Sequence, residues 1–164
     1  MTVIGALLVV SALLCALVAG FVFAFAVVVM PGIKGLDDGA FIRAFQVIDR
    51  VIQQGQPLFM LVWLGSAVSA AAAAIVGVWA LSGANRLLVI AAALIYICGA
   101  QLPTFGINLP LNNALQKLDP AAMSPEMRAR ERHAFEAPWN RANVLRTVCA
   151  TVTTVLLLVV LLRV

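Results

Sequence analysis

The chain has 164 residues, of which 63% are hydrophobic and 11% are charged, and its formal net charge is +4. Soluble domains carry roughly 25% charged residues, so this composition excludes an ordinary water-soluble fold, and the length admits only one compact domain. We expect no nucleic-acid partner, because basic residues beside membrane helices commonly meet anionic lipid or set the topology.

Four long segments contain no charged residue, and they cover 2–33, 57–81, 87–106 and 147–162. A hydrocarbon core about 30 Å thick is crossed by about 20 apolar residues in a helix, and the first three segments meet that length. The fourth does so if its helix begins upstream at Val144. We therefore predict an all-α integral membrane protein, a four-helix bundle with helical caps, in a single domain. The predicted spans cover about 3–30, 57–81, 87–107 and 144–162.

The first connection, about 31–56, is predicted to form an amphipathic cap. Pro31 is expected to end the first span, since proline disfavours helix at the residue before it. Asp37 or Asp38 can then cap a new helix. The apolar residues of that helix recur every three or four positions, at Phe41, Phe45, Ile48 and Ile52. This pattern predicts a helix that lies on the membrane or docks on the bundle.

Small residues recur at every fourth position in the first two spans. The first ladder is Ala12, Ala16, Gly20 and Ala24, and the second is Gly65, Ser69, Ala73 and Gly77. In lipid, helix backbones approach closely where small side chains line the interface. We expect both ladders to face neighbouring helices, and they are candidates to face each other.

The third connection, about 108–143, is predicted to repeat the plan of the first, on the same side of the membrane. Ser124 is a good cap with Pro125 at the first helical position, and the helix is expected to kink at Pro138 and continue into the fourth span. Nine of the eleven basic residues lie in or beside the two long connections. The positive-inside rule then predicts a multi-pass cell-membrane protein with cytoplasmic caps and extracytoplasmic termini.

The densest polar segment, 101–113, follows the third span and contains two prolines. Broken helix at membrane depth is tolerated only against protein or a water-filled cavity. Asn108 and Asn112 therefore either line a cavity that binds a polar ligand or cap the backbone at a helix end. For Gln101 and Asn113 the pattern favours capping.

A second polar cluster stands at the entrance to the fourth span and consists of Trp139, Asn140, Arg141, Asn143 and Arg146. Asn143 and Arg146 are one helical turn apart and can share a face. One interpretation is an interfacial anchor, with tryptophan at the headgroups and arginine reaching toward them. The other turns Asn143 and Arg146 inward, toward Asn108 and Asn112.

Two further residues are candidates for proton transfer. Asp49 lies near the apolar edge of the first cap, where it can act as a base or form an ion pair with Arg50, Arg43 or a residue of the other cap. His133, the only histidine, lies among charged residues, which favours a solvated surface residue over a catalytic base. We predict no metal and no cofactor, because the chain has no cluster of imidazole, thiolate or carboxylate ligands at a useful spacing.

Several short segments together resemble a bacterial and fungal family of four-span membrane proteins, of largely unknown function, that includes the anthrone oxygenases of aromatic polyketide pathways. They are Pro31-Gly32, residues 41–49, Asn108-Leu109-Pro110-Leu111-Asn112, Trp139-Asn140-Arg141 and Leu145-Arg146-Thr147. Many members of this family carry histidine where this chain has Asn143. The chain therefore departs from the family at a position where an imidazole would otherwise be available.

The resemblance implies oxidation of an apolar aromatic small molecule by dioxygen, without a cofactor. The site residues it implies are Asn108, Asn112, Asn143, Arg146 and Asp49, with His133 less favoured. The three amides would donate hydrogen bonds to an enolate oxygen, the arginine would offset its charge, and the carboxylate or the imidazole would take the proton. The alternative is a non-catalytic membrane protein: a small-molecule binder, a transport accessory or a subunit of a membrane complex. The small-residue ladders equally suit a homo-oligomer or a membrane partner.

Overall fold

The computed structural model describes residues 2–164, and this part of the chain consists of helices and short connections. The elements in chain order are α1 (Val3–Ala24), η1 (Phe25–Val29), α2 (Met30–Lys34), α3 (Asp38–Gln53), α4 (Pro57–Ala80), α5 (Gly83–Tyr96), η2 (Ile97–Gln101), η3 (Thr104–Asn108), α6 (Leu109–Gln116) and α7 (Pro125–Leu161). The three η segments are π-helical turns inside longer helices.

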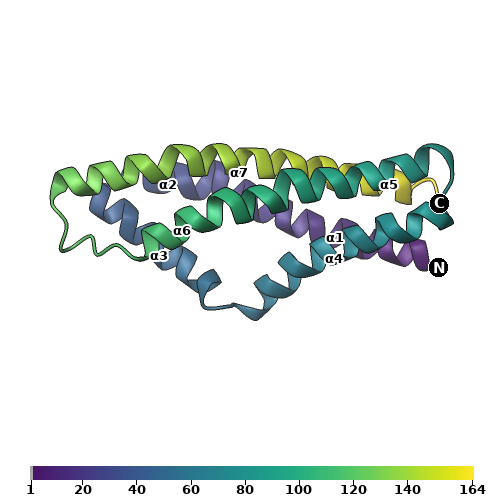
Figure 1. Cartoon of the computed structure of the whole chain (residues 1–164), viewed down its shortest axis with the longest axis horizontal. Coiled ribbons are helices and arrows are strands. Elements are labelled where there is room, and N and C mark those ends of the chain that lie inside the picture. The colour runs from purple at the N-terminus through teal and green to yellow at the C-terminus, as the bar shows by residue number, and fades with distance from the viewer. Residues whose placement is uncertain (1) are drawn as a thin grey trace.

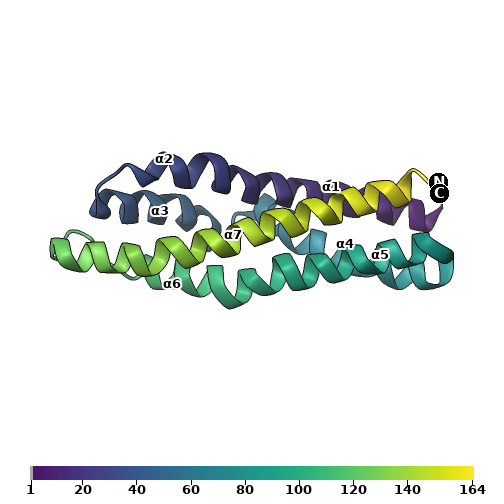
Figure 2. The same ribbon diagram turned by 90° about the horizontal axis from the view of Figure 1, so that it is seen from above.

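These elements join into four helices that are long and apolar enough to cross a membrane: Val3–Lys34, Pro57–Ala80, Gly83–Gln116 and Pro125–Leu161. The predicted all-α bundle with four spans is confirmed, and the chain is a multi-pass membrane protein. Both termini lie at one end of the bundle, and α2, α3 and α6 lie toward the other (Figures 1 and 2). We call the second end the cap end.

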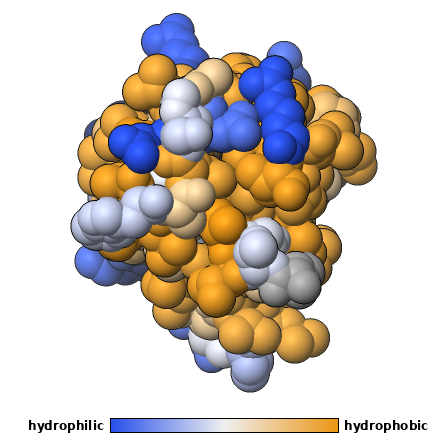
Figure 3. All heavy atoms as spheres, turned by 90° about the vertical axis from the view of Figure 1, so that its right-hand side faces the viewer, coloured by the Kyte–Doolittle hydropathy of each residue, from blue (hydrophilic) through white to orange (hydrophobic). Residues whose placement is uncertain are grey.

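The bundle contains two apolar cores. In the larger one, α1 and α5 each pack against α4 and α7, and a 2.6 Å hydrogen bond between Ser66 Oγ and Tyr96 OH joins α4 to α5. The smaller core lies at the cap end and is aromatic, with Phe45 in edge contact with both Phe135 and Trp139. Figure 3 shows the end of the bundle that carries the termini, where apolar atoms dominate and several hydrophilic side chains stand around them.

The helices do not break at their prolines, which corrects two predictions. The first span continues through Pro31 to Lys34, and the polar segment 101–113 is helical throughout. Each π segment ends two residues before a proline, at Pro31, Pro103 and Pro110. Proline lacks an N–H and clashes with the carbonyl four residues earlier, and a wider turn relieves that conflict without ending the helix. The residue before each proline donates instead to the carbonyl five residues back.

Helix α7 runs unbroken across Pro138 for 37 residues, so the predicted helix of the third connection does continue into the fourth span. Ser124 caps it by accepting a hydrogen bond from the Met127 amide over 3.3 Å, with Pro125 at the first turn. In the other cap, Asp37 rather than Asp38 is the capping residue of α3, and it accepts from the Ala40 amide over 2.9 Å.

Helix α3 packs against α6 and α7. Phe41 and Phe45 are buried, as their spacing predicts, whereas Ile48 and Ile52 are only half-buried. The buried face of α3 also contains two polar residues, Gln46 and Asp49. Polar groups on a buried helix face need hydrogen-bond partners, and both residues find them on or beside α6.

The two small-residue ladders behave differently. Ser69, Ala73 and Gly77 of α4 are buried, and a Cβ on Gly77 would lie 2.7 Å from Val89 Cγ1 of α5. That ladder therefore permits close approach of α5. In the ladder of α1 only Ala12 is buried, whereas Ala16 and Gly20 are exposed. The buried face of α1 follows a different register, through Leu8, Cys15 and Ala19, so the expectation that the two ladders meet along their length is wrong.

Candidate functional site

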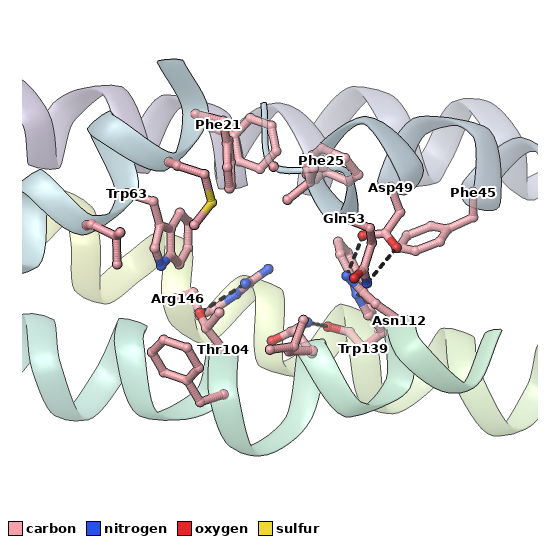
Figure 4. Close-up of a pocket in the computed structure, with 18 residues that line it drawn as sticks. Phe21, Phe25, Phe45, Asp49, Gln53, Trp63, Thr104, Asn112, Trp139 and Arg146 are labelled. Atoms are coloured by element: carbon pink, nitrogen blue, oxygen red, sulfur yellow. Dashed lines mark hydrogen bonds between the residues drawn. The ribbon is translucent and has the colours of Figure 1, made fainter. Parts of the chain in front are cut away.

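A cavity of about 300 Å³ lies between α1 and η1, α3, α4, η3, α6 and α7, toward the cap end (Figure 4). Its aromatic lining residues are Phe21, Phe25, Phe45, Phe59, Trp63, Phe105 and Trp139. Its polar lining residues are Asp49, Gln53, Thr104, Asn108, Asn112 and Arg146. A mostly apolar cavity with a few converging polar groups is the usual form of a small-molecule site.

Arg146 brings a positive charge into this cavity from α7. Only 6% of the residue is exposed, and Figure 4 shows its side chain reaching into the space between Trp63 and Asp49. Within residues 2–164 no carboxylate lies within 4.0 Å of its guanidinium. Its Nε is enclosed by the protein without a hydrogen-bond partner. A guanidinium carries five N–H groups, and Nη1 and Nη2 each use one of their two, so each keeps a spare donor.

Two neutral residues hold the guanidinium in place. Arg146 Nη2 donates to Asn143 Oδ1 over 2.6 Å, and Nη1 donates to Thr104 Oγ1 over 3.1 Å. Thr104 sits in η3 and donates its own hydroxyl hydrogen to the Ala100 carbonyl over 2.7 Å. Its lone pairs therefore remain available to the arginine. The cation is thus oriented without being neutralised.

Asn143 is 1% exposed and is not part of the cavity lining. Its Nδ2 donates to the Val22 carbonyl over 2.9 Å, while its Oδ1 accepts from Arg146. Both ends of the amide are engaged, and because Asn143 does not line the cavity it presents no N–H to a ligand there. Asn143 acts on the site through Arg146, which differs from the predicted direct contact with an enolate.

Asp49 of α3 is the acid of the site and is 2% exposed. Its Oδ1 accepts from Asn112 Nδ2 over 2.8 Å. Its Oδ2 accepts from Gln116 Nε2 over 2.9 Å and from Gln53 Nε2 over 3.2 Å. No lysine or arginine of the described chain forms an ion pair with it, so the predicted ion pair with Arg50, Arg43 or a residue of the other cap is wrong, and its partners on the other cap are neutral amides.

Asn112 links the acid to Trp139. Its Oδ1 accepts from the indole Nε1 of Trp139 over 2.7 Å, which leaves its Nδ2 to face Asp49. Asn108 also contacts Trp139, because its Nδ2 donates to the Trp139 carbonyl over 3.2 Å. Its Oδ1 is buried without a partner. Asn108 therefore lines the cavity with its amide nitrogen bonded to the Trp139 backbone and its oxygen enclosed without a partner, where the sequence had predicted a donor to a ligand.

The structure decides between the interpretations of the two polar clusters. Asn108 and Asn112 line the cavity and cap no helix end, because the helix continues to Gln116. Gln101 is buried, whereas Asn113 is exposed and accepts a hydrogen bond from Gln53 over 2.9 Å.

In the second cluster Trp139, Asn143 and Arg146 turn inward, so the interfacial-anchor interpretation is wrong for these three. His133 is exposed and does not line the cavity.

Two glutamines of the Asp49 cluster were missed. Gln53 follows Asp49 by four residues and Gln116 follows Asn112 by four, so each pair occupies one helix face. That spacing was available in the sequence, but the meeting of α3 with α6 was not. Over residues 2–164 no three His, Cys, Asp or Glu side chains gather as candidate ligands of a metal ion.

Comparison with known proteins gives one match. A protein-family model described as anthrone oxygenase matches residues 49–156, about two thirds of the chain. No curated protein and no solved structure matches. The matched range begins at Asp49 and includes Asn108, Asn112, Trp139 and Arg146. The chain belongs to the anthrone oxygenase family.

Proposed function

We propose that the protein is a membrane oxidoreductase that uses dioxygen to oxidise an apolar aromatic substrate with an acidic C–H bond, such as an anthrone. The observation that supports this most strongly is Arg146, a buried cation with no carboxylate partner in residues 2–164, on the wall of an aromatic cavity. A fixed positive charge stabilises an anion that forms beside it. Membership of the family supports the same class of reaction.

The reaction begins with proton transfer. The substrate C–H bond breaks, the proton goes to the Asp49 carboxylate, and the electron pair moves onto the ring carbonyl to give an enolate beside Arg146. The carbanion carbon of that enolate adds dioxygen and, with a proton, becomes a hydroperoxide. Loss of the second C–H proton then breaks the O–O bond, releases water and leaves a carbonyl. One oxygen atom enters the product and the other enters water, so no further oxidant is needed.

The aromatic lining contributes by excluding water. Phe25, Phe45, Trp63 and Trp139 are each at most 7% exposed and surround the polar groups. In such a low-dielectric site a cation stabilises an enolate far more than it would in water. A substrate of fused aromatic rings matches these walls, because flat rings can pack against flat side chains.

One observation favours a second function. Both oxygens of Asp49 already accept hydrogen bonds, from three amides, so its lone pairs are shared before any substrate arrives. A carboxylate that is occupied in this way is a weaker base, whereas Arg146 can still bind an anion. The second candidate function is therefore a non-catalytic membrane protein that binds an aromatic anion at Arg146. Turnover distinguishes the two functions, because a binder consumes no dioxygen.

The test is dioxygen uptake by the purified protein in lipid nanodiscs with a panel of anthrones. The proposal predicts uptake and quinone formation above the spontaneous rate, and their loss in Asp49→Asn. The matched control is His133→Gln, which also exchanges a titratable group for an amide but lies outside the cavity. Uptake that survives in Asp49→Asn would remove Asp49 as the base, and uptake at the spontaneous rate with every anthrone would favour the binder.

A further inference from the structure

The cavity has a buried inner wall and an exposed apolar rim. The inner wall includes Asp49, Asn108 and Arg146, each at most 6% exposed. Six lining residues are exposed. Gln53 and Gly55 lie at the connection between α3 and α4. The other four come from the spans and are all apolar: Met60 at 38%, Leu64 at 52%, Phe105 at 56% and Leu109 at 36%. Between the spans the cavity therefore opens through an apolar mouth, and these four residues are called its rim.

The rim comes from two different spans. Met60 and Leu64 are one turn apart on α4, while Phe105 and Leu109 are one turn apart on η3 and α6. Figure 1 shows that α4 meets α5 near the termini and diverges from η3 and α6 toward the cap end. Both spans are long and apolar enough to cross a membrane, so apolar residues exposed along them are expected to meet lipid rather than water.

From these observations we infer that the cavity is loaded sideways from the bilayer, through the mouth between α4 and η3–α6, by an amphipathic molecule that carries one acidic oxygen. The apolar rim admits the body of the molecule without exposing it to water. The second N–H groups of Arg146 Nη1 and Nη2, on the cavity wall, pair with the ionised oxygen, whether this belongs to a phenolate, an enolate or a carboxylate.

The burial of Arg146 supports this ligand chemistry independently of the mouth. A charged side chain within a membrane span is costly and generally pairs with another charge or marks a ligand pathway. Arg146 has no such partner in residues 2–164, and its neighbours Asn143 and Thr104 are neutral. An anionic ligand supplies the missing charge. This inference rests on the proposed function in taking the cavity as the substrate site, but it requires no turnover.

The test uses anthracene-9-carboxylate as a fluorescent probe, with the protein in phosphatidylcholine nanodiscs. Association and dissociation rates are measured by stopped flow in the double variant Leu64→Trp, Phe105→Trp, which narrows the mouth. Its matched control is Leu61→Trp, Leu102→Trp, which also introduces two tryptophans, at exposed positions of the same helices outside the cavity lining.

Lateral loading predicts that both rates fall several-fold in the mouth variant and remain unchanged in the control. Unchanged rates in the mouth variant would overturn it and indicate entry from water beside the α3–α4 connection.

A second measurement tests the recognition of charge. Arg146→Gln is expected to weaken binding of anthracene-9-carboxylate about tenfold, the loss of one charge-assisted hydrogen bond, and to leave binding of neutral anthracene unchanged. Equal effects on both probes, or no preference of the unmodified protein for the anion, would overturn the assignment. Anion binding that is intact in a protein without dioxygen uptake would reject the proposed oxidation and leave lateral loading standing.

Discussion

Arg146 Nη2 donates to Asn143 Oδ1 over 2.6 Å, and through Asn143 the cation of the cavity wall is tied to the carbonyl of Val22 in α1. The partner that fixes the guanidinium is therefore a neutral amide, whereas in an ion pair it would be a carboxylate. The amide orients the charge without cancelling it, which is the property that an anion-stabilising site requires.

Replacing that amide by a carboxylate tests this property. Asn143→Asp keeps the size of the side chain but pairs Arg146 with a negative charge and removes the donor to Val22. We expect anion binding and dioxygen uptake to fall at least tenfold, since the spare charge is lost. The control is Asn140→Asp, the same exchange on the same helix outside this cavity. Equal activity of the two variants would show that the charge of Arg146 is not used.

The indole of Trp139 is expected to position the acid. Trp139→Phe removes the donor to Asn112 Oδ1, so Asn112 is free to turn its amide away from Asp49. The lost hydrogen bond is expected to lower the free energy of unfolding by about 1 kcal/mol and to reduce kcat more than it raises KM. Trp79→Phe is the matched control, because Trp79 is 78% exposed. A change in KM alone would contradict a positioning role.

The π segment η2 is predicted to depend on Pro103. Pro103→Ala restores the missing N–H and allows the helix to narrow to regular α geometry, which would rotate Thr104 away from Arg146. We expect an unchanged or higher melting temperature together with weaker anion binding. Pro138→Ala removes a proline from α7, where there is no π segment, and is expected to leave binding unchanged. Loss of stability without loss of binding in Pro103→Ala would exclude this role of the π turn.

The orientation of the protein is a further prediction. Both termini lie at the same end of the bundle (Figure 1), and nine of the eleven basic residues lie in or beside the two long connections. The positive-inside rule therefore favours extracytoplasmic termini. Tags at either terminus should react with a membrane-impermeant reagent added to intact cells. Reaction only after the cells are opened would reverse the orientation.

The four spans were predictable because lipid selects long uncharged helices, and that signal lies in each segment by itself. That Arg146, Asn108 and Asn112 line a cavity was also among the predictions, since they are polar groups at membrane depth, which are costly without a partner or a role. The one-turn spacing of Asn143 and Arg146 predicted that the two share a helix face. It did not decide whether that face turns toward the bundle interior or toward the lipid headgroups.

Other features depend on tertiary contacts that no local pattern contains. Proline predicts a helix break from local sterics, but Pro31 and Pro103 sit in helices held by packing, where a π turn costs less than a break. The partners of Asp49 come from α3 and α6, some 60 or more residues apart in the sequence. Their meeting decides that amides rather than arginines surround the carboxylate.

The most direct test of the account is the rate of anthrone oxidation by Arg146→Gln, compared with the unmodified protein in the same nanodiscs. An electrostatic role for the buried cation predicts that kcat falls by about 10²–10³, the usual cost of removing a group that stabilises an oxyanion. The fold should persist, as measured by circular dichroism, because glutamine can still bond to Asn143 or Thr104. An unchanged kcat would contradict the claim that Arg146 stabilises an anion formed in this cavity.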